Sequence, residues 1–136
     1  MDCVFCKIIL GELPSVKVYE DDEFLAFMDK KPINPGHLLV IPKEHKETLL
    51  DMEPYKVGKL YEKVAIIAKA VKEALKAHGL NIGQNNGRAA NQIIPHVHVH
   101  IIPRYFGDSP TGKWPERKDA NLEELREIAE KIKRFL

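Results

Sequence analysis

The chain has 136 residues, 44% of them hydrophobic and 30% charged, which is enough to bury the core of one soluble domain. Its formal net charge of +1 gives no overall field that would attract nucleic acid or an anionic membrane, so any phosphate recognition must be local. No apolar run approaches the length of a membrane span, and Asp2 stands where a signal peptide would carry basic residues. We therefore expect a cytoplasmic protein that binds neither nucleic acid nor membrane.

The first part of the chain predicts a short helix and three strands. Residues 3–10 form a short segment that is closed by turn-forming residues, which favours a helix or turn. Apolar segments bounded by polar turns then predict strands at 16–19, 24–28 and 37–41, with Pro42 ending the third.

The second part predicts a long helix, two strands and a final helix. Pro54 suits the first turn of the long helix, which is expected to end at 78–79. Its apolar residues recur at spacings of three and four: Val57, Leu60, Tyr61, Val64, Ala68, Val71 and Leu75. Strands follow at 80–84 and 97–102, the second stopped by Pro103. Asn121 is expected to cap the last helix, whose predicted buried stripe is Leu122, Leu125, Ile128 and Ile132.

These elements together predict an α+β fold. A five-stranded antiparallel sheet would pack against one long central helix, a short N-terminal helix and a C-terminal helix. The expected division is one domain over residues 1–136, with its core at 3–105 and a tail and helix at 106–136.

The run from His96 to His100 places three histidines at alternate positions of the fifth predicted strand. Side chains of a strand alternate between its faces, so His96, His98 and His100 share one face and the intervening valines point to the other. Three interpretations are open: a polar face of an edge strand, a metallohydrolase site with histidine ligands, or a neutral imidazole that attacks phosphorus. The spacing alone does not separate the last two.

Two cysteines form a Cys3-x-x-Cys6 motif at the N-terminus. A redox motif would require a strand before it, and none is predicted there. As half of a metal site the pair needs two more ligands, and His45 and His96 are available for a Cys₂His₂ zinc site. The alternative is two buried, reduced cysteines, as in many protein cores.

Several segments of the chain resemble the histidine triad (HIT) family of nucleotide hydrolases and transferases. The run at 96–104 is similar to the family signature, and further segments match in the family's order: 3–9, 24–29, 35–43 and 83–87. The resemblance covers roughly residues 3–105, and several motifs in the correct order make it specific. It extends to the prokaryotic members that carry an N-terminal CxxC zinc site.

The resemblance implies a nucleophile, His98, that attacks the α-phosphorus of a nucleotide and forms a covalent nucleotidyl-histidine. His100 and His37 match residues that surround the phosphate and orient the nucleophile. Water would then release a nucleoside monophosphate. It also implies a structural zinc ion bound by Cys3, Cys6, His45 and His96, which leaves His98 and His100 for the chemistry.

The resemblance further implies a purine nucleotide or nucleotide conjugate as the substrate, and a homodimer. Asp29 matches the carboxylate that binds the ribose hydroxyls, and Asn85 and Gln92 match polar groups near the phosphate and leaving group. The matching apolar walls of the base pocket are Phe5, Ile8 and Phe27.

One position departs from the family pattern: Ile93 stands where several members carry serine or threonine, and isoleucine cannot assist a leaving group. Trp114, in the irregular segment that follows the fifth strand, is either packed against the domain or part of substrate specificity. The expected function is cleavage at the α-phosphorus through His98. The alternatives are a purine-nucleotide sensor or scaffold with little turnover, and a metal-dependent phosphohydrolase.

Overall fold

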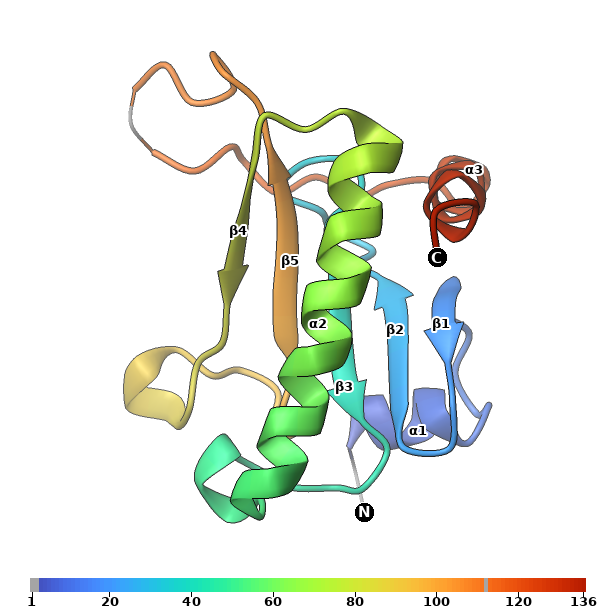
Figure 1. Cartoon of the computed structure of the whole chain (residues 1–136). Coiled ribbons are helices and arrows are strands. Elements are labelled where there is room, and N and C mark those ends of the chain that lie inside the picture. The colour runs from blue at the N-terminus through green and yellow to red at the C-terminus, as the bar shows by residue number, and fades with distance from the viewer. Residues whose placement is uncertain (1–2, 112) are drawn as a thin grey trace.

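The computed structural model describes residues 3–111 and 113–136, and it has the predicted α+β architecture (Figure 1). Five antiparallel strands form one sheet in the order β1-β2-β3-β5-β4. Their bounds are β1 Lys17–Glu20, β2 Phe24–Met28, β3 Leu38–Pro42, β4 Gly79–Gly83 and β5 Val99–Arg104. The helices are α1 Val4–Ile9, α2 Pro54–Leu75 and α3 Leu122–Lys133, with 3₁₀ turns η1 Leu49–Asp51 and η2 Arg88–Ala90. Within the described residues, no helix combines the length and apolarity needed to span a membrane.

The central strands are buried on both faces because different helices cover the two sides of the sheet. On the face that α2 crosses in Figure 1, alternate residues such as Ala26 and Val40 join the larger core with α2 and α3. On the other face, Leu25, Phe27 and Leu39 form a smaller core with α1. Residues of α3 also belong to the larger core. The division into one domain over residues 1–136 stays a prediction.

The fifth strand begins later and ends later than the sequence predicted. It starts at Val99, because the Val97 N–H donates to the Lys46 carbonyl instead of to a neighbouring strand. It also continues through Pro103, which pairs with Leu80 of β4. The Pro103 carbonyl accepts from Asn34 on the β3 side, beyond the end of the β3–β5 pairing, so the missing N–H of the proline interrupts no ladder bond.

The predicted stripe of the last helix was wrong at its first residue. Leu122 is 52% exposed, whereas Leu125, Ala129 and Ile132 are buried. The Asn121 cap is confirmed, since its side chain accepts from the Glu124 N–H at 2.7 Å. The long helix ends at Leu75, before the predicted 78–79, because Lys76 adopts a left-handed conformation.

Gly36 generates a stability prediction. Its φ of +101° is unfavourable for any other residue, and a Cβ there would contact the Leu75 side chain closely and lie 3.3 Å from Pro103. We expect Gly36→Ala to lower the free energy of unfolding by about 1–3 kcal/mol, measured by chemical denaturation. The matched control is Gly58→Ala in α2, where a Cβ meets nothing within 4 Å, and which should stabilise the protein by roughly 0.5–1 kcal/mol. Equal effects of the two substitutions would contradict this account.

Candidate active site

The three histidines share one face as expected: His96 and His98 come just before β5, and His100 lies in it. Val97, Val99 and Ile101 belong to the larger core, while the three histidines lie on the face that α1 covers. His96 is fully buried and His98 is 9% exposed. The ring centroid of His98 lies 5.1 Å from that of Phe5 in α1 and 5.1 Å from that of His100.

One hydrogen bond fixes the tautomer of His98. Its Nδ1 lies 2.7 Å from the His96 carbonyl oxygen, which can only accept, so Nδ1 carries the proton. The Nε2 atom therefore keeps its lone pair. Burial lowers the pKa of His98, which keeps the ring neutral at physiological pH. A neutral imidazole with a fixed free Nε2 is the form that can attack phosphorus.

A second chain of hydrogen bonds orients His37 and His100. The Ile33 N–H donates to Nδ1 of His37 at 3.0 Å, so His37 carries its proton on Nε2. This Nε2–H donates to Nδ1 of His100 at 2.9 Å, which leaves the His100 proton on its own Nε2 as a donor. Both rings are neutral, because burial lowers the pKa of each to about 4 despite the opposing charge of Asp29.

Asp29 lies at the end of β2, between the histidines and the tail. Its Oδ2 is 3.5 Å from Nε2 of His37 and accepts from the Arg117 guanidinium at 2.6 Å. Its Oδ1 accepts from the Lys31 N–H at 2.9 Å. Asp29 and the predicted base walls Phe5, Ile8 and Phe27 line one cavity of about 440 Å³, within the size range of ligand pockets.

The two amide residues of the predicted phosphate site have different surroundings. Asn85 is exposed and lines a second cavity, of about 400 Å³, together with His100 and Trp114. Gln92 is buried, and its side-chain NH₂ donates to the Glu47 and Ile94 carbonyls at 2.6 and 3.0 Å. Both donors of Gln92 are therefore used to hold the loop before β5, and neither is free for a phosphate.

The four predicted metal ligands form one cluster. Cys3 caps α1, its Sγ accepts from the Cys6 N–H, and it lies 3.3 Å from Nδ1 of His96. Nδ1 of His45 lies 3.2 Å from Nδ1 of His96 and 3.3 Å from Sγ of Cys6. A tetrahedral zinc ion with bonds of about 2.0 Å to nitrogen and 2.3 Å to sulfur separates its ligand atoms by roughly 3.3–3.8 Å. The cluster therefore fits a metal ion of this kind.

The tautomer of His96 supports the same fit. Its Nε2 lies 2.8 Å from the Pro42 carbonyl oxygen and must donate, so Nδ1 presents a lone pair to the cluster. This lone pair lies 3.2 Å from Nδ1 of His45, so a metal ion or a proton on His45 would satisfy it. Burial, followed by the neighbouring Cys3, raises the pKa of the Cys6 thiol to about 11, which argues against a reactive redox pair.

A further group of possible ligands, Asp29, His37 and His100, lies close together but is not arranged for a metal. The Nε2 atom of His37 that would face the ion already carries a proton, because its Nδ1 accepts from Ile33. His98 belongs to neither group of possible ligands found within the described residues. The three histidines of the run therefore do not converge on one ion, which weakens the metallohydrolase interpretation.

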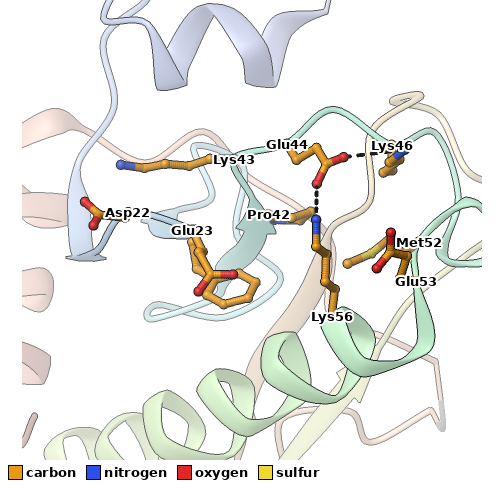
Figure 2. A pocket seen from close by; sticks show the side chains of 10 residues that line it. Asp22, Glu23, Pro42, Lys43, Glu44, Lys46, Met52, Glu53 and Lys56 are labelled. Atoms are coloured by element: carbon orange, nitrogen blue, oxygen red, sulfur yellow. Dashed lines mark hydrogen bonds and ion pairs between the residues drawn. The ribbon is translucent and has the colours of Figure 1, made fainter.

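Another cavity, which no histidine lines, lies between α2 and the β2–β3 end of the sheet (Figure 2). Charged side chains dominate its rim, and Glu44 lies 3.0 Å from Nζ of Lys56 and 3.5 Å from Nζ of Lys46. None of the predicted site residues lines it. Mutually paired surface charges of this kind need no ligand.

Sequence reasoning missed Arg117. Its side chain reaches Asp29 from a position 88 residues later in the chain, in a segment with no helical or strand periodicity. No local pattern marks such a residue, because only the tertiary fold brings the tail against the end of β2. Trp114 lies in the same segment and stacks on Arg104, with the guanidinium 5.3 Å from the ring centroid.

The depressed pKa values generate a pH prediction. We expect ring NMR signals of His37 and His100 to show protonation only as the pH falls toward about 4. Unfolded histidines have a pKa near 6.5, so the unfolded chain binds more protons between these values. The contribution of these two rings to the free energy of unfolding is therefore fully present above about pH 6.5. It is lost progressively as the pH falls from about 6.5 toward 4. Protonation of either ring near pH 6.5 would contradict the hydrogen-bond assignment.

Comparison with known proteins agrees with this geometry. The HIT domain family matches residues 10–107. The adenosine 5′-monophosphoramidase of Schizosaccharomyces pombe is 40% identical over 136 residues, covering 97% of this chain and 96% of the relative. The solved structure of a HIT-like protein from Bartonella henselae has a TM-score of 0.92 at 42% identity, covering 99% of this chain and 96% of that one. A zinc-bound histidine triad family protein from Mycobacterium smegmatis has a TM-score of 0.87 at 38% identity, covering 99% and 93%. The chain belongs to the HIT family.

Proposed function

We propose that this protein is a nucleotide hydrolase or nucleotidyl transferase that cleaves purine nucleotide conjugates at the α-phosphorus. The observation that carries the proposal is the hydrogen bond from His98 Nδ1 to the His96 carbonyl, which leaves Nε2 as a neutral nucleophile. The S. pombe relative, named as an adenosine 5′-monophosphoramidase, supports chemistry of this kind.

The proposed reaction has two steps. The Nε2 lone pair of His98 forms a bond to the α-phosphorus, and the bond from phosphorus to the leaving group breaks with its electron pair. The Nδ1–H bond to the His96 carbonyl stabilises the positive charge that develops on the ring. A water molecule then attacks phosphorus, the P–N bond breaks, and a nucleoside monophosphate leaves with His98 neutral again.

His100 and His37 serve as orienting residues in this proposal. The outward Nε2–H of His100 is a donor suited to a phosphoryl oxygen as negative charge develops on it. His37 keeps His100 in that tautomer, because the Nε2–H of His37 donates to Nδ1 of His100 and this nitrogen must remain an acceptor.

The nucleoside is proposed to occupy the cavity of Phe5, Ile8 and Phe27, with its ribose on Asp29. This apolar cavity suits a planar purine, and the adjacent carboxylate suits hydroxyl donors. Asn85 is proposed to face the phosphate or the leaving group from the second cavity, whereas Gln92 acts indirectly by holding the loop. The homodimer and the cytoplasmic location stay predictions.

We also propose that the cluster of Cys3, Cys6, His45 and His96 holds a structural zinc ion. Four protein ligands fill a tetrahedral site, so no position is left open for substrate. The zinc-bound relative from M. smegmatis supports the choice of metal. The ion would join the N-terminal end of α1 to the loop after β3 and to the segment before β5, and the protein's own residues would carry the chemistry.

A rapid-quench experiment tests the nucleophile. Enzyme mixed with a radiolabelled adenylyl donor should give an acid-labile adduct that maps to His98, because phosphorus–nitrogen bonds hydrolyse in acid. His98→Ala should lower kcat/KM on the order of 10⁴-fold or more, while His78→Gln on the exposed side should leave it unchanged. An adduct on another residue would overturn the assignment. Tight monophosphate binding without any turnover would favour the nucleotide-sensor alternative.

Metal analysis tests the zinc proposal. Purified protein should contain one zinc ion per chain, and chelation or Cys6→Ser should lower the melting temperature, because the ion's binding energy contributes to folding. Once refolded with zinc, the protein should recover its stability. If chelation instead stops catalysis in a protein that remains folded, and zinc restores the activity, the protein is a metal-dependent phosphohydrolase and the ion is catalytic.

A further inference from the structure

Arg117 brings a positive charge from the tail into the candidate active site. Its Nη2 donates to Oδ2 of Asp29 at 2.6 Å, and its Nε donates to the Lys31 carbonyl at 2.8 Å. The segment around it is fixed independently, since the Ala120 N–H donates to the Lys30 carbonyl at 3.0 Å. The guanidinium is therefore held in place at two points and is not a freely moving surface charge.

Arg117 lines both cavities of the site. In one it lies beside Asp29 and the apolar walls proposed for the base, and in the other it lies beside His100 and Asn85. Among the described residues that line the cavity of His100, Arg117 is the single lysine or arginine. A substrate that extends from the base cavity past His100 would therefore pass the guanidinium.

Arg117 balances the negative charge of Asp29 beside His37 and His100. His37 and His100 are neutral by their hydrogen bonds, so they contribute no positive charge. Asp29 is the carboxylate next to them, 3.5 Å from His37. Among the described residues, Lys30 and Lys31 also line the base cavity, but Arg117 is the single lysine or arginine that forms an ion pair with Asp29. Without Arg117, Asp29 would lose this partner. With it, two of the five guanidinium N–H donors are used and the others remain for an anion.

The described lining of the His100 cavity also lacks a general acid that could protonate a poor leaving group. Its described residues include no hydroxyl or carboxyl side chain, and Ile93 nearby in sequence is 87% exposed and carries no proton to donate. A leaving group that departs as a stable anion needs no such proton, whereas an amine or ammonia does.

From these contacts we propose that Arg117 is a specificity-determining residue that makes the site favour conjugates whose leaving group is an anion. This inference rests on the proposed reaction at His98. With adenosine 5′-phosphosulfate, Nε2 of His98 bonds to the α-phosphorus, and the P–O bond breaks to release sulfate with the electron pair. Arg117 offsets the charge of Asp29 and donates to the departing oxyanion.

The test compares two substrates that share the adenosine and the α-phosphorus. Adenosine 5′-phosphosulfate releases an anion, and adenosine 5′-phosphoramidate releases ammonia. Loss of a hydrogen bond to a charged group predicts that Arg117→Gln lowers kcat/KM for the phosphosulfate about 10- to 100-fold. The value for the phosphoramidate should change less than about 3-fold, and Arg117→Lys should restore part of the discrimination because it keeps the charge.

Lys118→Gln is the matched control, since it removes the same charge from the next position of the tail, where the side chain is exposed. It should leave the ratio of the two kcat/KM values unchanged. An equal loss for both substrates in Arg117→Gln, or no loss, would overturn the proposal, because a purely structural role of the tail would not change the ratio. If the wild-type protein turns over neither substrate and forms no adduct on His98, the proposed function itself fails.

Discussion

His96 is the residue on which the rest of the site depends. Each polar group of this buried residue has a separate partner: Nε2–H binds the Pro42 carbonyl, Nδ1 faces the cysteine cluster, and the carbonyl accepts from His98. One side chain and its carbonyl thus connect the end of β3, the cluster of possible metal ligands and the ring proposed as nucleophile. A shift of His96 would disturb all three, because buried polar groups have no water to replace a lost partner.

The two faces of the sheet have different roles: one packs into the larger core, and the other carries the candidate active site. Valines of the histidine run pack into the larger core with α2 and α3, so the backbone that carries the histidines is rigid. The opposite face carries the short helix α1, and two cavities lie there, lined in part by Arg117 of the tail. Donors held by a closely packed backbone need no rearrangement when charge develops on a substrate.

Burial keeps these histidines neutral, and this has a cost for binding anions. Rings that carry no charge can donate and attack, but they cannot balance the charge of a phosphate. The positive charge comes instead from Arg117 of the tail, held by Asp29 at the end of β2. Nucleophile and counter-charge therefore come from different elements, and the tail takes part in the electrostatics of the site.

The sequence by itself determined the elements, the face shared by the three histidines and the family. These features are local: a strand alternates its side chains, a helix repeats every three to four residues, and the motifs occur in a fixed order. Strand ends were less accurate, because the end of β5 depends on the partner strands and not on Pro103 itself.

Only the tertiary structure decided which proton each ring carries and which residues share a cavity. The tautomers depend on carbonyls and amides that distant segments supply, such as Pro42 for His96. Gln92 is the clearest difference, since its donors are taken by backbone carbonyls that the sequence does not place nearby. Arg117 shares no motif with Asp29, because an ion pair needs proximity alone and leaves no periodic trace in the chain.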